Sequence, residues 1–305
     1  MKLDADAQDD GEDAPPGERR RRPASRWWRS ARGLAHDDSL LPDAVDGEHR
    51  QLLADVGHEL KSPLSIVLAL CTRLETAGRL DGEDAHDVAR IRANTYSMLR
   101  RVQDLMLMAR LESPGQQLEA AVIDIAAVVR ACVDGFASLA AERGLQLQVS
   151  VPEALPAMAD EEKVVSVVSN LVANAIRHAR ADGTVRCSVT AASGRMTLEV
   201  ADDGPGVAHD QRETIFERYR RGTRSSGTGL GLAIVGEIAA LHGGSVAVGD
   251  APEGGALFTV ELPLRTPRPA SASVPGPPRS LALADRQRPI VEELRGELDS
   301  APGRA

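Results

Sequence analysis

The chain has 305 residues, of which 42% are hydrophobic and 2% aromatic, so about two domains with cores of Leu, Val, Ile and Ala are expected. Its net charge of −9 argues against general nucleic-acid binding. No apolar run approaches the roughly 18 residues of a membrane-spanning helix. Three widely spaced cysteines in apolar patterns predict buried free thiols in a reducing cytoplasm, without a disulfide or zinc site.

Residues 1–44 are acidic and then basic, with scattered Pro and Gly, and are expected to be disordered. They contain no apolar core, so they do not form a signal peptide. Trp27 and Trp28 stand among arginines, a pattern that can lie on an anionic membrane surface. A solvated linker is the more common meaning of such a run, and membrane contact is the less favoured interpretation.

Residues 45–112 have the pattern of two long helices joined by a turn at 78–84. The first helix carries an apolar stripe at steps of three and four, made of Leu53, Val56, Leu60, Leu64, Val67, Cys71 and Leu74. His58 points about 140° away from Leu53, and Ser62 shares this outward face. Two helices alone have too little core, so we expect a homodimer in which two hairpins form a four-helix bundle.

Residues 118–264 have the pattern of one domain of strands and helices. Period-two alternation predicts strands at 145–151, 184–190, 196–202, 245–248 and 257–263. Helical spacing predicts helices at 124–143, 160–180 and 229–242, and a shorter helix opening on a capping box at 210–219. The predicted fold class is therefore α+β, with a helical hairpin before an α/β sandwich.

Residues 265–305 form a tail with a Pro-rich linker at 265–280. The segment "PIVEELRGEL" that follows can form a short amphipathic helix from Ile290, Val291, Leu294 and Leu298. We expect this helix to be loosely held, with docking on a partner as the alternative.

Four stretches of the α/β domain combine groups that suit a nucleotide. In "NLVANAIRH" (170–178), Asn170, Asn174 and Arg177 or His178 fall near one helix face, where two amides and a cation can bind a metal and phosphates. In "DDGPGV" (202–207), Asp202 ends a strand and can accept a hydrogen bond from the exocyclic amine of adenine.

The two remaining stretches are a loop and a glycine-rich turn. "IFERYRRGTR" (215–224) carries Arg218 and three further arginines on a segment expected to be mobile. "SSGTGLGLAIV" (225–235) feeds an apolar helix and offers free amides where phosphates bind well. Singly, such stretches are usually turns or surface contacts. The glycines do not give a Rossmann G-x-G-x-x-G, and a P-loop sequence is absent.

Taken in order, these stretches resemble the boxes of a bacterial two-component sensor histidine kinase. "DVGHELKSPL" (55–64) resembles the H box, "NLVANAIRH" the N box, "DDGPG" the first G box, "IFERYRR" the F box and "GTGLGLAIV" the second G box. The resemblance covers about residues 47–264. It implies a dimerisation and phosphotransfer domain at 45–112, followed by a Bergerat ATP-binding fold at 118–264.

The resemblance also implies roles for individual residues. His58 would attack the γ-phosphate of ATP, and Glu59 would hold the other ring nitrogen and accept its proton. Ser62 stands where the family's phosphatase activity commonly uses Thr or Asn. Asn174 would ligate Mg²⁺ with Asn170 beside it. The remaining nucleotide contacts would come from Arg177, His178, Asp202, Gly204, Gly206, Arg218, Gly227, Thr228, Gly229, Leu230 and Gly231.

The expected reaction is ATP-dependent autophosphorylation of His58 and transfer to an aspartate on the receiver domain of a response regulator. No sensor domain is recognisable before residue 45, so a sensor or partner protein is expected to supply the signal. One alternative is an ATP-binding scaffold that regulates a partner kinase. Another is an ATPase or protein-serine kinase. Asn170 disfavours an ATPase, because ATPases of this fold place a glutamate there to activate water.

Overall fold

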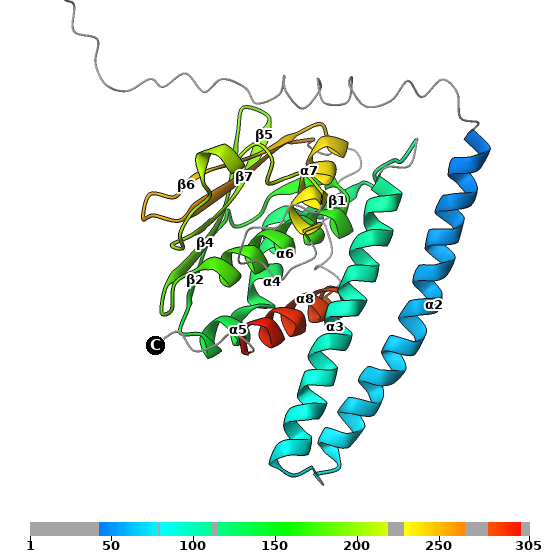
Figure 1. Ribbon diagram of the computed structural model, residues 1–305. Helices are drawn as coiled ribbons and strands as arrows, with labels where there is room; N and C mark the ends of the chain where they lie inside the picture. Colours follow the sequence, from blue (N-terminus) through cyan, green and yellow to red (C-terminus); the bar gives the residue numbers. More distant parts are fainter. Residues whose placement is uncertain (1–42, 79, 112–114, 219–228, 266–279, 300–305) are drawn as a thin grey trace, which may run out of the picture. The chain divides into compact units, whose positions relative to one another are not determined.

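The computed structural model describes residues 43–78, 80–111, 115–218, 229–265 and 280–299 (Figure 1). It begins with a hairpin of two long helices, α2 (Asp43–Thr76) and α3 (Gly82–Leu111), as predicted. Helix α2 continues through Pro63, and α3 opens with Glu83 and Asp84 in its first turn. In the described part of the chain, no helix is both long enough and apolar enough to cross a membrane.

The apolar stripe of the hairpin is only partly covered within one chain. Cys71, Val88 and Leu99 are buried where α2 packs on α3. Large apolar side chains on both helices are nevertheless at least 44% exposed: Leu60, Ile66, Leu70, Leu74, Ile91, Met98 and Leu105. The hairpin therefore has apolar surface that its own fold does not bury.

A five-stranded sheet with the order β2-β4-β5-β7-β6 forms one layer of the second domain. Its strands are β2 (Gln146–Ser150), β4 (Thr184–Ala192), β5 (Arg195–Asp202), β6 (Ser245–Asp250) and β7 (Ala256–Pro263). Strand β2 runs parallel to β4, and the other neighbours are antiparallel, with Val200 opposite both Cys187 and Phe258. These five strands correspond to the five that the alternation predicted.

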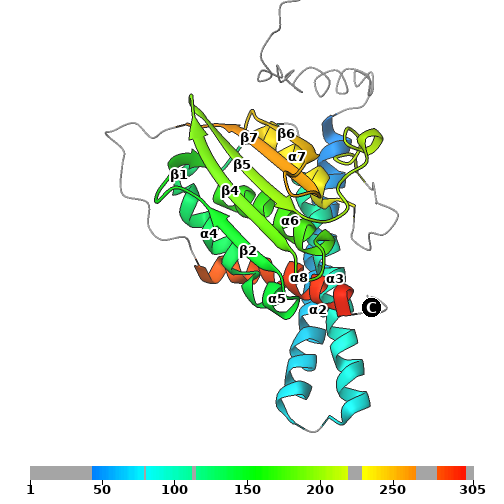
Figure 2. The same ribbon diagram turned by 90° about the vertical axis from the view of Figure 1, so that its left-hand side faces the viewer.

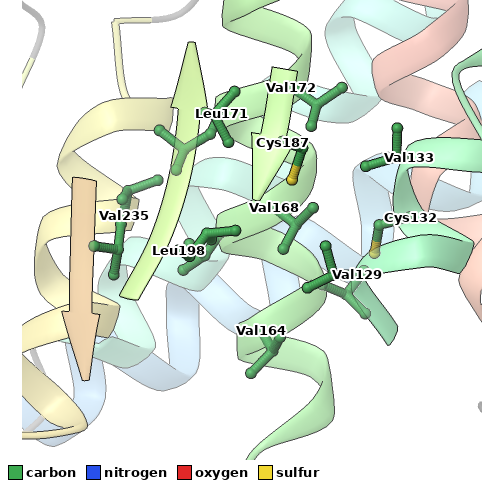
Figure 3. Packing of buried hydrophobic residues seen from close by; sticks show 14 of the residues in the cluster. Val129, Cys132, Val133, Val164, Val168, Leu171, Val172, Cys187, Leu198 and Val235 are labelled. Carbon is green, nitrogen blue, oxygen red and sulfur yellow. The ribbon is translucent and has the colours of Figure 1, made fainter. Parts of the chain in front are cut away.

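Helices cover one face of this sheet (Figure 2). They are α4 (Ile125–Asp134), α5 (Ala137–Glu142), α6 (Glu161–His178) and α7 (Gly231–Leu241). On β5, Met196, Leu198 and Val200 point to the helices and are buried, while the alternate residues are half-buried or, at Arg195, exposed. Figure 3 shows side chains of α4 and α6 packed against those of the strands. The sandwich thereby holds α6 and α7 rigidly against the sheet.

Two local predictions were wrong, and one small sheet was not predicted. The expected helix at 124–143 is two helices, because the chain turns at Gly135 and Phe136. The expected helix at 210–219 is a short 3₁₀ helix, η2 (His209–Gln211), followed by turns. A two-stranded antiparallel sheet of β1 (Ala121–Asp124) and β3 (Pro156–Ala159) was not predicted.

The tail helix also differs from the prediction. Helix α8 (Ser280–Asp299) begins about ten residues before the expected segment and contains Pro289. It is not loosely held, since Leu294 is fully buried and Gln287 and Glu293 are each 2% exposed. Its neighbours are α3, α6 and α4 (Figures 1 and 2).

Candidate functional site

Helix α6 carries the residues of the N box. Asp160 caps its first turn by accepting a hydrogen bond from the backbone N–H of Lys163, and two glutamates in that turn suit the helix dipole. Most of the helix is buried against the sheet and α4. Asn170 is buried, whereas Asn174, Arg177 and His178 are half-buried. As predicted, the amides and the arginine recur at spacings that place them near one face.

Asn170 lies against the second G box. A Cβ added to Gly231 would be 2.7 Å from Oδ1 of Asn170, so glycine permits α7 to approach this amide closely. Its Nδ2 donates to the carbonyl of Ser166 at 2.9 Å. Its Oδ1 accepts from Nη2 of Arg100, on α3, at 2.9 Å. The N box and the second G box therefore meet at this side chain.

Asp202 is a buried carboxylate at the end of β5. Its Oδ1 accepts from the N–H of Gly204 at 2.9 Å and from the N–H of Ala256 at 3.3 Å. Burial raises the pKa of this carboxyl, and the two N–H donors oppose that rise. Because both bonds end on Oδ1, Oδ2 is the oxygen that can accept a hydrogen bond from a ligand amine.

The glycines of the first G box allow close backbone contacts. A Cβ on Gly204 would collide with the carbonyl oxygen of His178, at the end of α6. Gly206 has a φ of +74°, which disfavours a side chain, and lies against Gly255. Gly204 thereby joins the strand end that carries Asp202 to the N-box helix.

The start of α7 follows a glycine turn. Gly229 has a φ of +71°, Leu230 is buried at the N-cap, and among the described residues no side chain caps this end of the helix. Uncapped N–H groups at a helix start bind anions well. Gly227 and Thr228 lie outside the described residues, so their predicted contacts are untested.

Arg177 forms an ion pair with α8 and, among the described residues, leaves a buried nitrogen unmatched. Its Nε donates to Oε2 of Glu297, on α8, at 2.8 Å. Among the described residues its Nη2 is buried without a hydrogen-bond partner. A buried, unmatched guanidinium N–H is costly and suits an anionic ligand such as a phosphate.

The F box is anchored by its aromatic residue. Phe216 packs edge-to-face on Phe258 of β7, with ring centroids 6.3 Å apart. Arg218 is exposed, and the arginines beyond it fall outside the described residues. The anchored side chain therefore fixes where the segment leaves the sheet.

The H box lies on α2. Glu59 and Ser62 are exposed, while the side chain of His58 is outside the described part. Gly57 is buried, and a Cβ there would meet the side chain of Met106 on α3. The structure brings together the N box and both G boxes, but among the described residues α2 packs chiefly on α3.

Sequence reasoning missed three residues around the site. Asp203 accepts hydrogen bonds from the backbone N–H groups of Arg180 and Thr184, which holds the turn after α6. Gly255 cannot carry a Cβ because of the carbonyl oxygen of Asp202. Their positions in the pairs Asp202–Asp203 and Gly254–Gly255 are local sequence signals for these turn contacts. No local signal identifies the third residue, Arg100.

This arrangement defines a class of protein: a helical hairpin joined to an α+β domain in which an amide-bearing helix, a strand-end carboxylate and glycine turns carry groups that suit a nucleotide. Two family models match the chain. The His Kinase A (phospho-acceptor) domain matches residues 48–114, and the Histidine kinase-, DNA gyrase B-, and HSP90-like ATPase matches residues 159–266. Together they cover more than half of the sequence, and the chain belongs to the sensor histidine kinases of two-component systems.

Similar proteins carry the same description. The sensor histidine kinase TmoS of Ectopseudomonas mendocina is 32% identical over 233 residues, 74% of this chain and 24% of TmoS. The signal transduction histidine-protein kinase BaeS of Escherichia coli (strain K12) is 30% identical over 239 residues, 76% of this chain and 51% of BaeS. The chain thus spans about half or less of the length of these relatives.

A solved structure agrees with the fold. The crystal structure of full-length ShkA in complex with AMPPNP has a TM-score of 0.61 and 29% sequence identity. The match covers 83% of this chain and 58% of that chain. The α+β class and the order of hairpin and sandwich are therefore confirmed.

Proposed function

We propose that this chain is a protein-histidine kinase that phosphorylates its own His58 from ATP and passes the phosphoryl group to an aspartate of a response-regulator receiver domain. The observation that carries this proposal is the close contact of Asn170 with Gly231, on a helix that also bears Arg177, in a chain that also has an H box. We retain 45–112 and 118–264 as the limits of the two domains.

ATP would be held at both ends of the site. Oδ2 of Asp202 would accept from the adenine amine, with His178, Gly204 and Gly206 forming the turn beside it. The amides that begin α7 and the unmatched Nη2 of Arg177 would bind phosphates. The other contacts would come from Asn170, Arg218, Gly227, Thr228, Gly229, Leu230 and Gly231.

Amide oxygens suit Mg²⁺, which takes oxygen ligands, so Asn174 with Asn170 beside it fits this ion. The ion would neutralise charge on the phosphates. A ring nitrogen of His58 would form a bond to the γ-phosphorus as the bond to the bridging oxygen breaks and ADP leaves. Glu59 would hold the other ring nitrogen and accept its proton. The Ser62 hydroxyl would orient a water that attacks the phosphorus of the phosphorylated aspartate on the regulator, which releases inorganic phosphate and the free carboxylate.

Asn170 supports kinase rather than ATPase activity. A neutral amide has no carboxylate with which to take a proton from water. Its Nδ2 and Oδ1 are also engaged by Ser166 and Arg100. Water attack on ATP should therefore be slow, which preserves the phosphoryl group for His58.

The exposed apolar side chains of the hairpin support a homodimer. Seven of them lie on α2 and α3, and pairing with a second hairpin would bury a surface that one chain leaves in water. Cytoplasmic location and a sensor protein that supplies the signal belong to the same proposal.

The test is incubation of the full chain with γ-labelled ATP and Mg²⁺. We expect acid-labile, base-stable label in the wild type and in His86→Gln, a control histidine exposed on the same hairpin. The label should be absent from His58→Gln. Nucleotide binding without label would favour the scaffold alternative. Released phosphate or acid-stable label would favour an ATPase or serine kinase.

A further inference from the structure

Helix α8 is fitted closely into its place. Gln287 donates to the carbonyl of Cys132 at 2.9 Å and to Oγ of Ser169 at 3.1 Å, which joins α8 to α4 and α6. A Cβ on Gly135 would collide with the side chain of Gln287. Matched polar groups and glycine-permitted contacts indicate a specific docking site rather than a loose association.

A second glycine, Gly296, allows the C-terminal part of α8 to pack closely on the hairpin. A Cβ on Gly296 would be 2.5 Å from Cβ of Ala93, on α3. Leu294 is fully buried two positions earlier. Helix α8 therefore contacts the hairpin and the ATP-binding domain at once.

Two carboxylates of α8 reach cations around the candidate nucleotide site. Glu293 is 2% exposed, and its Oε2 accepts from Nη1 of Arg100 at 2.5 Å. The same guanidinium donates from Nη2 to Oδ1 of Asn170. Glu297 accepts from Nε of Arg177 at 2.8 Å. One helix thus bonds directly to the predicted phosphate-binding arginine and, through Arg100, to the first N-box amide.

The ion pairs of Glu297 and Glu293 engage the same groups that a bound nucleotide would use: Arg177 and, through Arg100, Asn170. A phosphate bound to Arg177 would bring negative charge beside the carboxylate of Glu297, and like charges repel. The amide oxygen of Asn170 that accepts from Arg100 is also less available to act as an oxygen ligand for Mg²⁺. By linkage, a helix that binds these residues weakens nucleotide binding, and a nucleotide weakens the docking of the helix.

We propose that α8 is an inhibitory segment of the kinase, whose Glu297 and Glu293 occupy Arg177 and Arg100 and must be released for full nucleotide binding and autophosphorylation. This inference rests on the proposed function and adds the regulation of its site. The docked carboxylates stand in for phosphate charge.

The test measures affinity for a fluorescent ATP analogue and the rate of autophosphorylation in the full chain. Glu297→Gln keeps the size of the side chain and removes its charge. We expect it to bind the analogue about fivefold to tenfold more tightly and to label faster. The matched control, Glu253→Gln, removes a carboxylate that pairs with Arg186 on the sheet, and should behave as the wild type.

Hydrogen exchange of the wild-type chain gives an independent readout. Saturating AMPPNP should speed exchange of the backbone amides of 280–299, because nucleotide and docked helix exclude each other. Unchanged or slowed exchange there, or equal affinity of Glu297→Gln and the wild type, would overturn the inference while leaving the kinase proposal intact. Absence of nucleotide binding in every variant would overturn both.

Discussion

In the α/β domain Phe258 and Val260 are 1% and 0% exposed, whereas on the hairpin Ile66 and Met98 are 59% and 56% exposed. Both regions have strong apolar patterns in the sequence, but among the described residues the sandwich buries its apolar face and the hairpin leaves much of its own exposed. Apolar periodicity therefore predicts which face of a helix or strand will be buried, but not whether the layer that covers it belongs to the same chain. Truncation of core side chains should therefore lower the stability of the sandwich, and substitution of exposed apolar residues should weaken self-association through the hairpin.

The largest expected effect comes from cutting the sandwich core. Phe258→Ala removes a buried ring that packs edge-to-face on Phe216, and should lower the free energy of unfolding by about 3–5 kcal/mol. Urea unfolding followed by circular dichroism measures this. Val149→Ala, at an exposed apolar position on β2, should change the free energy by less than about 0.5 kcal/mol. Equal losses at both positions would contradict the assignment of the core.

The next effect concerns the junction between the first G box and α6. Gly204→Ala places a methyl group against the carbonyl oxygen of His178. Because a backbone atom cannot easily move aside, the substitution should lower the free energy of unfolding by about 1–3 kcal/mol. Calorimetric titration with AMPPNP should show weaker binding, because the turn that holds Asp202 is displaced. Gly249→Ala is the control, since a Cβ there has open space. Unimpaired binding by Gly204→Ala would show that this contact does not support the site.

The hairpin surface provides the third prediction. Leu70→Asp, on an exposed apolar position of α2, should weaken self-association in sedimentation equilibrium by about tenfold or more, a change of about 1.4 kcal/mol. Val149→Asp makes the same change on an exposed apolar position of the sheet and should leave association unaltered. If both variants associate as the wild type does, the dimer does not use this stripe.

The smallest effect is a pH dependence inside the sandwich. Burial lowers the pKa of His242 below 6.5, although Nδ1 donating to the carbonyl of Ile238 opposes this shift. As the pH falls, the unfolded chain therefore binds a proton at His242 more readily than the folded protein does. The stabilising contribution is complete above about pH 6.5 and is lost as the pH falls through the folded pKa.

The melting temperature should therefore fall between pH 7.5 and pH 5.5, and fall less in His242→Gln, whose side chain does not titrate. Differential scanning calorimetry at the two values measures both. All other residues are common to the two proteins, so the difference between their melting temperatures isolates the contribution of His242. An equal fall in melting temperature in the two proteins would show that groups other than His242 cause the pH dependence.

Much of the sandwich could be predicted because its elements are long and face a single layer. The strand Arg195–Asp202 alternates cleanly, and the helix Glu161–His178 has a cap and a broad apolar face. Strands β1 and β3 are four residues each, too short for alternation to distinguish them from a loop, and their pairing is non-local. The turn at Gly135 interrupts an apolar pattern that otherwise continues.

For the site, residue types and order predicted the N box and both G boxes. A Cβ on Gly204 would collide with backbone, and a Cβ on Gly231 would crowd the side chain of Asn170. The docking of α8 could not be predicted, because it depends on contacts of Gly135 and Gly296 with distant elements. Arg100 belongs to the hairpin pattern, and its bond to Asn170 exists only after both domains have folded. The roles given to His58, Glu59 and Ser62 remain predictions.

The contact of Gly204 with the carbonyl of His178 has a mechanical meaning for the binding cleft. This close backbone contact couples the strand end that carries Asp202 to the helix that carries Asn174 and Arg177. Under the proposed function, a displacement of the turn that binds the purine would therefore also displace the groups that align the reacting phosphate.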